Sequence, residues 1–506
     1  MRPTHARPTS ATLNDYQTVS GLIRLAFGAS LWLLITATLA DADLWGHLRF
    51  GLDMLASGRL AAIDPYSFTS DRMWMNHEWL AELLMAVSYR AAGATGLNTL
   101  KILCIATIVW VVAAIARQLE ATPAARDMLV GLAVFATYTR TSVIRPQLFS
   151  VALFAAVLYL LREVDRGRLR AMWLVPPSFV AWVNLHGGWI LGLAIVFLWL
   201  AFTLGDRRFA AARLQLIAAG GLTALATLVN PYGTGLWLFL SETVRFGRAD
   251  ITEWNPLLAL PPLILAFEAI LPAVAIAAML QARWRIPRRD AAIVLVLIAA
   301  AIRVGRLDAF AQAALAILFG PGILAGLEIL GAKLRASFWR ARLPGGALAA
   351  VTLLALALFL GGRRMTKILV DGPWIPDKEA AVFLRDRVPG TRLLTWFDWG
   401  EYAVWQLAPA GIRVSIDGRR ETVYSSDVVS HHNAFYEARP GDLDYADRIG
   451  ADSAWLPIAA PVIPVLRNRG WSTAFESSRS VVLTRAPAQT HRTTIDAAEV
   501  RVFPWP

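Results

Sequence analysis

A short acidic segment follows the first long apolar run of the chain. It reads Asp41-Ala42-Asp43-Leu44-Trp45-Gly46-His47, so two carboxylates stand two residues apart. In extended chain such residues share a face, so Asp41 and Asp43 can converge on one hydroxyl or one cation. A carboxylate at a membrane surface is partly desolvated, which raises its basicity and suits it to general-base catalysis. The segment therefore predicts a base, although the same residues could simply mark the water boundary at a helix end.

His47 adds a second kind of chemistry to this segment. If a helix begins at His47, its imidazole can still face Asp43, and the pair could bind a divalent cation such as Mg²⁺ or Mn²⁺ or relay a proton. So few ligands do not make a closed metal site, and hydrogen bonding by His47 is the simpler interpretation.

Another charged pair lies in the same loop, inside Trp74-Met75-Asn76-His77-Glu78-Trp79. His77 and Glu78 are adjacent, and a histidine next to a carboxylate suits proton transfer or substrate binding. The flanking indoles are typical anchors at a membrane interface, and Asn76 could cap the helix that follows. Both interpretations stay open.

Three arginines stand at the ends of apolar runs on the side of the acidic loop: Arg145, Arg303 and Arg306. Lys and Arg are rare in the outer loops of membrane proteins, so we expect each arginine on that side to have a partner. A guanidinium group binds phosphate through charge-assisted hydrogen bonds, and the phosphate of an anionic lipid fits. The alternative is an ion pair with an acidic side chain: Asp41, Glu253 or Asp308.

Three more polar side chains belong to the same predicted face. Gln147 follows Arg145 at the start of a run, and His186 lies in Asn184-Leu185-His186-Gly187-Gly188, where glycines permit a tight turn. Glu253 lies in a loop that could cap a groove open to lipid. Each could support a substrate, and a turn histidine without a role is an equally good interpretation of His186.

The composition defines the setting of these residues. The chain has 506 residues, is 56% hydrophobic and 17% charged, and has a mean hydropathy of +0.49, and several apolar runs can cross a bilayer. The net charge of +12 could suggest nucleic acid, but the excess cations lie in short loops, which the positive-inside rule explains. The single cysteine, Cys104, excludes an intramolecular disulfide. We predict a polytopic membrane protein without a nucleic-acid partner.

The apolar runs predict about eleven transmembrane helices. They cover residues 19–40, 97–117, 127–142, 145–161, 171–185, 187–205, 213–230, 262–282, 288–304, 307–331 and 342–362. Four arginine-rich loops between them should face the cytoplasm: Arg162–Arg170, Arg207–Arg213, Arg283–Arg289 and Lys333–Arg342. An N-terminus inside and a C-terminus outside satisfy all four loops if Trp79–Gly93 is a surface helix of the outer loop 41–96.

Residues 363–506 are more polar and predict a second domain. Apolar segments at Arg392–Phe397, Ile412–Asp417 and Val481–Thr484 alternate with helical patterns at 377–388, 399–407 and 442–449, which is typical of a small α/β domain. Asp398-Trp399-Gly400-Glu401 and Asp417-Gly418-Arg419 lie at strand ends, which are favoured ligand positions, although turns explain them nearly as well. Beyond Pro487 we expect an irregular strap.

The organisation of residues 19–362 resembles the GT-C superfamily of integral membrane glycosyltransferases, such as protein O-mannosyltransferases and the aminoarabinose transferases of lipid A. The resemblance rests on a first span ending in acidic residues, a long outer loop with a surface helix, further spans and an outer C-terminal domain. It implies a sugar donor linked to a polyprenyl phosphate, with Asp41 or Asp43 as base or metal ligand. Arg145 occupies a place like the outer polar cluster of those enzymes.

Several motifs more closely resemble a family of uncharacterised bacterial multi-pass proteins, which brings no assigned reaction. Among them are Asn76-His77-Glu78-Trp79-Leu80 and Asn230-Pro231-Tyr232-Gly233. The first stands where the better-known GT-C enzymes have a Pro-Pro-Leu stretch before the surface helix. That departure leaves the acceptor of the sugar open.

The sequence therefore predicts a mainly α-helical membrane domain, residues 1–362, and an extracytoplasmic α/β domain, residues 363–506. The predicted function is an inverting glycosyltransferase at the outer face of a bacterial inner membrane, in contact with lipids. The predicted site comprises a base (Asp41 or Asp43), phosphate-binding arginines (Arg145, Arg303, Arg306), supporting residues (His47, His77, Glu78, Gln147, His186, Glu253) and a divalent cation, if any, at Asp43 and His47.

Two other functions stay open. A transporter or flippase of lipid-linked sugars would need charges within the spans, for which Glu268 is the clearest candidate, and broken helices in repeated halves. A non-catalytic subunit of an envelope assembly would use residues 363–506 for docking.

Overall fold

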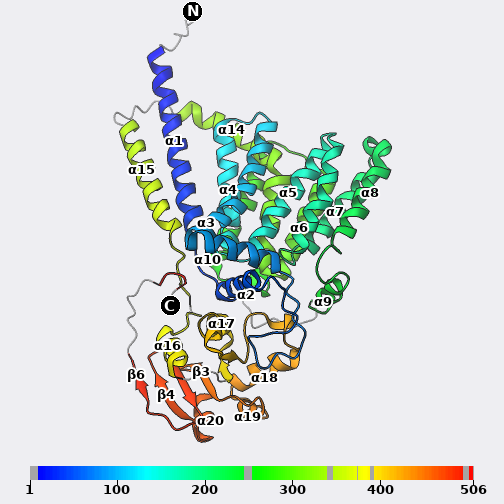
Figure 1. The fold of residues 1–506 in the computed structure, drawn as a ribbon. Coiled ribbons are helices and arrows are strands. Elements are labelled where there is room, and N and C mark those ends of the chain that lie inside the picture. Colours follow the sequence, from blue (N-terminus) through cyan, green and yellow to red (C-terminus); the bar gives the residue numbers. More distant parts are fainter. Residues whose placement is uncertain are drawn as a thin grey trace, which may run out of the picture.

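The computed structural model describes residues 10–243, 254–338, 346–372, 374–387, 392–493 and 501–504. In Figure 1 a layer of long helices lies at the top, and a smaller part that holds the sheet lies below it. Helices suit the apolar runs because a helix satisfies its backbone hydrogen bonds within its own segment, without water.

Each apolar run that the sequence predicts as a span contains helix in the described residues. The helices of the upper layer are α1 (Ser10–Thr36), α3 (Trp79–Gln118), α4 (Pro123–Thr141), α5 (Gln147–Asp165), α6 (Val175–Val183), α7 (Trp189–Gly205), α8 (Arg213–Ala226), α10 (Pro262–Glu268), α11 (Ile270–Gln281), α12 (Arg288–Arg303), α13 (Asp308–Leu318), α14 (Gly320–Phe338) and α15 (Gly346–Met365). Two shorter helices, α2 (Leu44–Ser57) and α9 (Gly235–Thr243), lie at the lower edge of this layer (Figure 1).

Within the described residues, four helical segments are long and apolar enough to cross a bilayer, or five if one bent pair is a single span. The four are Trp79–Gln118, Gln147–Asp165, Arg207–Ala226 and Pro262–Gln281. Other described apolar helices are shorter, among them Gly21–Thr36 and Trp189–Gly205. The total of about eleven spans therefore stays a prediction.

The run 307–331, predicted as one span, is broken in the structure. Gly305–Leu318 and Gly320–Ala332 meet at an angle of 64°. The sequence at the break is Phe319-Gly320-Pro321-Gly322. Proline cannot donate a backbone hydrogen bond to the preceding turn and clashes with its carbonyl, so it ends one helix and begins another.

The predicted surface helix is present but joined to the next span. α3 runs from Trp79 to Gln118 with non-helical backbone at Ala92 and Gly93. Gly93 has a φ of 56°, which a residue without a Cβ adopts at little cost. The kink lets the first part of α3 take a different direction from the second.

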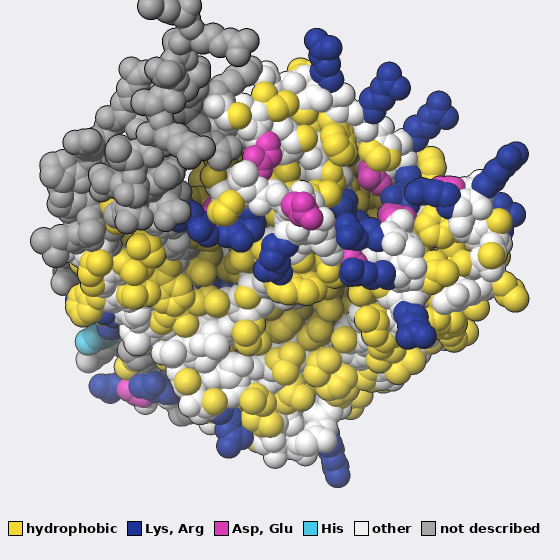
Figure 2. Space-filling view, turned by 90° about the horizontal axis from the view of Figure 1, so that it is seen from above, with side chains coloured by type: hydrophobic (Ala, Val, Ile, Leu, Met, Phe, Trp, Pro, Cys, Tyr) yellow, Lys and Arg dark blue, Asp and Glu magenta, His cyan; other side chains and the backbone are white. Residues whose placement is uncertain are grey.

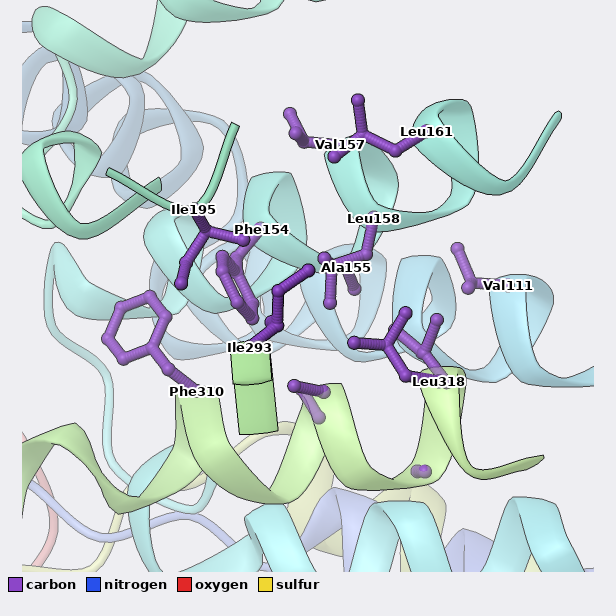
Figure 3. Packing of buried hydrophobic residues seen from close by; sticks show 14 of the residues in the cluster. Val111, Phe154, Ala155, Val157, Leu158, Leu161, Ile195, Ile293, Phe310 and Leu318 are labelled. Atoms are coloured by element: carbon purple, nitrogen blue, oxygen red, sulfur yellow. The ribbon is translucent and has the colours of Figure 1, made fainter. Parts of the chain in front are cut away.

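The core of the upper layer lies between α3, α5, α7, α12 and α13. Figure 3 shows Phe154, Ile195, Ile293 and Phe310 packed against one another, and the rings of Phe154 and Phe310 meet edge to face with centroids 5.2 Å apart. Lipid tails are as apolar as these side chains, so close packing rather than escape from water holds such helices together.

The lower part contains a six-stranded sheet in the order β2-β1-β3-β5-β4-β6. Its strands are β1 (Arg392–Thr395), β2 (Arg413–Val414), β3 (Ser453–Pro457), β4 (Ser472–Glu476), β5 (Ser480–Thr484) and β6 (His491–Arg492), and its helices are α16 (Lys378–Arg387), α17 (Gly400–Leu407), α18 (Ser426–Tyr436), α19 (Tyr445–Arg448) and α20 (Ile463–Asn468). The pairs β1–β2 and β1–β3 are parallel, whereas β5 is antiparallel to β3 and β4. The sequence missed β3 and β4.

Backbone contacts join the two parts. The N–H of Ala40 donates to the carbonyl of Leu369 at 2.7 Å, and the N–H of Phe68 donates to the carbonyl of Val414 at 3.1 Å. Within the predicted strap, the carbonyl of Pro504 accepts a hydrogen bond from Trp45 Nε1 at 2.8 Å. The outer loop and the α/β part therefore share one hydrogen-bonded boundary.

The opposite end of the helical layer is basic. Figure 2 views that end and shows many Lys and Arg side chains over it. Exposed arginines of the predicted cytoplasmic loops include Arg166, Arg168, Arg207, Arg208, Arg283 and Arg285. The charge asymmetry along the helices agrees with the predicted orientation.

Candidate active site

Asp41 lies between α1 and α2, where the chain enters the boundary between the two parts. Its side chain is buried and forms an ion pair with Arg145. Its Oδ1 atom accepts a hydrogen bond from the N–H of Asp43 at 2.9 Å. Of the alternatives left open for Arg145, the structure selects pairing with Asp41.

Asp43 immediately precedes α2 and is half-buried. Its carboxylate reaches toward the α/β part, because a Cβ on Gly418 would lie 2.4 Å from Asp43 Oδ1 and 2.8 Å from Glu401 Oε1. Asp43 and Glu401 therefore border the same small space next to Gly418. Two carboxyl groups from distant segments meet there.

Glu401 belongs to α17 and is almost completely buried. Burial, followed by the charges of Asp43 and Asp417, raises the pKa of Glu401 well above its ordinary value. The sequence pointed to Asp398-Trp399-Gly400-Glu401 as a possible ligand position but did not connect it with Asp43. In the sequence, the position of Glu401 at the end of a predicted strand was the only indication of a functional role.

Three imidazoles surround the carboxylate of Glu78. The Nε2 atom of His186 lies 3.6 Å from Glu78 Oε1, that of His77 lies 3.8 Å from the same atom, and that of His47 lies 4.0 Å from Oε2. Burial favours a raised pKa for Glu78, but the charges of His77, His47 and Arg306 outweigh it and lower the pKa. Glu78 is therefore ionised at the centre of this cluster.

His47 is the cationic member of the cluster. Its Nδ1 lies 3.1 Å from Glu82 Oε1, whose other oxygen accepts a hydrogen bond from Asn76 at 2.6 Å. Burial lowers the pKa of His47, but the hydrogen bond to Glu82 and the charges of Glu78, Glu82 and Asp43 raise it to about 9. The predicted hydrogen-bonding role of His47 fits this geometry.

His186 is the neutral member. Its Nδ1 accepts the N–H of Gly188 at 3.0 Å and lies 2.8 Å from Ser150 Oγ. The hydrogen of the neutral ring therefore resides on Nε2, which faces Glu78. Burial lowers the pKa of His186 to about 3.

The hydrogen bonds orient both rings: the Nε2 of His186 carries a hydrogen, and the Nδ1 of His47 faces Glu82. Within the described part of the chain, no three His, Cys, Asp or Glu side chains converge as a ligand set. The predicted cation at Asp43 and His47 stays a prediction.

The three predicted phosphate-binding arginines do not lie together. The guanidinium carbon of Arg306 lies 5.0 Å from the ring centroid of Trp254. The charge of Arg306 lowers the pKa of both Glu78 and His186, and the charge of Arg145 lowers the pKa of His186. The main-chain carbonyl of Arg306 accepts a hydrogen bond from Gln147 Nε2 at 2.8 Å. Arg303 is the last residue of α12, and its side chain is exposed. The chain turns between Arg303 and Arg306, so the two side chains have different surroundings.

Glu253 lies outside the described residues. The remaining predicted site residues gather at one boundary, where α2, the start of α3, the α6–α7 turn and the start of α5 meet the α/β part. We define the polar cluster as Asp41, Asp43, His47, His77, Glu78, Arg145, Gln147, His186 and Arg306. Sequence reasoning missed Glu82, and it named Glu401 as a possible ligand position without connecting it with this cluster.

Of two cavities among the described residues, only the smaller is lined by a residue of the polar cluster. One of about 10 Å³ is lined by Arg145 and Lys101 together with apolar side chains such as Leu148 and Phe149. A larger one of about 350 Å³ lies between the outer loop and α18, with Phe68, Asp71 and His431 in its walls. Neither cavity is lined by both a carboxylate and an arginine of the polar cluster.

Comparisons with known proteins concern this fold. The oligosaccharyltransferase of Archaeoglobus fulgidus in its apo form matches with a TM-score of 0.57 at 12% identity, over 93% of this chain and 74% of that chain. ArnT from Cupriavidus metallidurans in the apo state gives 0.50 at 15%, over 94% and 99%. The mycobacterial arabinofuranosyltransferase AftD gives 0.51 at 16%, over 92% of this chain and 40% of that chain.

The chain has the GT-C fold. No protein-family model matches the sequence, and no curated protein matches it. At these identities the likeness concerns the overall fold alone. The polar cluster lies at the boundary between these two parts.

Proposed function

We propose that this protein is an inverting glycosyltransferase that moves a sugar from a polyprenyl-phosphate donor to an acceptor hydroxyl at the outer face of a bacterial inner membrane. The observation that carries the proposal is the polar cluster at one end of a GT-C helical layer. It combines a half-buried carboxylate, Asp43, with two arginines, Arg145 and Arg306. ArnT, one of the matched proteins, has been solved bound to undecaprenyl phosphate.

Asp43 is the better candidate for the base. Asp41 is buried against Arg145, and an opposite charge in contact with a carboxylate makes it less basic. Asp43 is half-buried, and its Oδ1 atom borders the small space next to Gly418. In the proposed step, the acceptor oxygen bonds to the anomeric carbon as its proton passes to Asp43. The bond from that carbon to the phosphate oxygen breaks, and its electron pair stays on the polyprenyl phosphate.

The arginines would stabilise the phosphate that leaves. Arg306 and Arg145 are the candidates because both act on His186 within the cluster. Positive groups placed where charge develops are often the largest source of rate enhancement. Arg303 is too exposed and too peripheral to share this role.

The test uses the full-length protein in lipid nanodiscs with a panel of undecaprenyl-phosphate donors that carry labelled sugars, and native membranes supply the acceptor. Asp43→Asn should lower transfer by roughly 10²–10⁴-fold, which is the usual value of general-base catalysis. Arg306→Gln should also lower it, whereas Arg303→Gln and Asp53→Asn, on the same helix as His47, should not. Wild-type transfer by Asp43→Asn on an active donor pair would disprove the mechanism.

The transporter alternative is weaker in this structure. Glu268 is buried, and its carboxylate accepts hydrogen bonds from Thr139 at 2.8 Å and Gln312 at 3.0 Å. These bonds tie α10 to α4 and α13, which suits a structural role. One broken span, at Phe319, does not make the repeated halves expected of alternating access.

A further inference from the structure

The outer loop and the α/β part enclose a cavity that the proposed catalytic step does not use. Its volume is about 350 Å³, and small-molecule sites typically have roughly 300–1,000 Å³. Phe68, Thr69 and Asp71 of the outer loop line one side, and the region of α18 and α19 lines the other; Figure 1 shows the loop passing beside α18. The N–H of Ser425 donates to Asp71 Oδ1 at 2.7 Å, so a hydrogen bond joins the two sides.

Rings and aliphatic side chains form the apolar surface of this cavity. Phe68 is half-buried and Tyr445 is buried, and the ring of His431 stacks on that of Tyr445 with centroids 5.7 Å apart and planes at 24°. Val428 and Ile449, both half-buried, complete the surface. The face of an aromatic ring is electron-rich and attracts C–H groups, so such surfaces suit the C–H face of a pyranose ring.

Two exposed carboxylates, Asp71 and Asp427, line the same cavity. Within the described residues neither forms an ion pair with a basic side chain, and the hydroxyl of Ser426 donates to Asp427 Oδ1 at 3.4 Å. The imidazole of His431 is held by Asp442, whose Oδ1 lies 2.6 Å from Nδ1. A carboxylate accepts hydrogen bonds from hydroxyl groups and repels anions. The cavity therefore suits an uncharged sugar and disfavours phosphate and uronate groups.

The cavity and the polar cluster lie along one stretch of the outer loop. Asp71 lines the cavity, and His77 of the polar cluster follows six residues later, which is at most about 22 Å of extended chain. The N–H groups of Asp71 and Arg72 both donate to the carbonyl of Val423, at 3.3 and 3.2 Å, so this stretch is fixed on the α/β part. A glycan of a few sugar residues spans such a distance.

We propose that this cavity is a subsite for a glycan acceptor: it holds an uncharged sugar residue of the acceptor chain while the sugar that receives the transfer lies at the polar cluster. The role rests on the proposed glycosyl transfer. The cavity takes no part in bond making and contributes affinity and acceptor selection. A basic peptide fits less well, because an ion pair with an exposed carboxylate contributes little in water and leaves the apolar surface without a matching partner.

Saturation-transfer NMR on the full-length protein in nanodiscs tests binding without a donor. The neutral probes are cellotriose, maltotriose, mannotriose and chitotriose, and trigalacturonic acid and trilysine are the anionic and cationic probes. At least one neutral trisaccharide should bind. The double variant Asp71→Asn/Asp427→Asn keeps the shape of both side chains and should weaken this binding roughly tenfold, because hydrogen bonds to a charged acceptor are the stronger ones.

A second variant removes a ring and keeps every charge. Phe68→Leu retains an apolar side chain and should weaken trisaccharide binding roughly threefold or more, because the aromatic face is lost. Glu437→Gln, an exposed position just beyond α18, is the control and should bind as the wild type does. The absence of trisaccharide binding, binding that survives both variants, or equal or tighter binding of trigalacturonic acid or trilysine would overturn the assignment.

The transfer assay separates the acceptor subsite from the proposed function. The trisaccharide that binds should compete with the membrane acceptor in the wild type, and Asp71→Asn/Asp427→Asn should raise the KM for the acceptor with little change in kcat. Transfer that depends on Asp43 but is unaffected by the trisaccharide and by both cavity variants would overturn the acceptor subsite alone. Trisaccharide binding in the cavity together with wild-type transfer by Asp43→Asn would overturn the proposed function alone.

Discussion

At the scale of single residues, the charge on His47 should make the stability of the protein depend on pH. Folding raises the pKa of His47 from 6.5 to about 9, because the contacts with Glu82 and Glu78 outweigh burial. A raised pKa means that the stabilisation is complete below about pH 6.5 and is lost as the pH rises through 9. His47→Gln should therefore lower the melting temperature most at pH 6, with an energy on the order of 3 kcal/mol, and least near pH 10.

The partner of His47 offers the matched control. In Glu82→Gln the hydrogen bond from Nδ1 loses its charged acceptor, so most of this pH dependence should disappear and a second change at His47 should add little. An equal effect of His47→Gln at pH 6 and pH 10, measured by differential scanning fluorimetry, would contradict the assignment.

At the scale of elements, Arg419 joins the outer loop to the α/β part. Its guanidinium binds Asp64 at 2.7 and 2.9 Å and Asp417 at 2.6 Å, and it lies over the rings of Phe50, Tyr66 and Trp74 at 4.8–5.3 Å. Its removal would leave two buried carboxylates unpaired, which typically costs about 3–5 kcal/mol.

Arg419→Ala should therefore loosen this boundary and expose the segment after residue 366 to protease. Arg419→Lys should rescue it only in part, because lysine lacks the planar fork that serves two carboxylates and stacks on rings. The exposed Arg413→Ala is the control. Proteolysis of Arg419→Ala at the wild-type rate would show that other contacts hold the boundary.

At the scale of the whole molecule, the basic end and the polar cluster lie at opposite ends of the helices (Figures 1 and 2). The charge bias of membrane proteins places the basic end in the cytoplasm, so the cluster and the α/β part should face the periplasm.

Cysteine labelling tests this orientation, because the single native cysteine, Cys104, is buried. In intact spheroplasts an impermeant maleimide should label Ser430→Cys, an exposed position on α18, and should label Arg166→Cys only after lysis. The reverse pattern would place the proposed transfer on the cytoplasmic side.

The divalent cation also belongs to the whole-molecule scale, since its ligands would come from several elements. We expect EDTA to leave transfer unchanged within about twofold, because the described His and carboxylate groups are already paired or protonated. Loss of activity on chelation, restored by Mn²⁺ or Mg²⁺, would show that the polar cluster rearranges around a metal.

The sequence by itself predicted the long apolar helices and one common face for the candidate site residues. Both signals depend on local composition, which the sequence gives directly. The apolar runs predicted the helices, and the arginine-rich loops predicted that Asp41, His77 and His186 share one side of the membrane. The length of the run 307–331 predicted a single span. The sequence analysis therefore missed the break at Phe319, although Pro321 marks it.

Only the tertiary structure decided which charged groups meet. Asp41 pairs with Arg145, Arg306 joins the cluster without Arg303, and Glu401 reaches Asp43 from a segment more distant along the chain than any other contact in the site. Such contacts depend on side-chain direction and on close approach at glycines between segments far apart in sequence. Periodicity reports neither quantity, so the partners of each charge become visible only in the folded molecule.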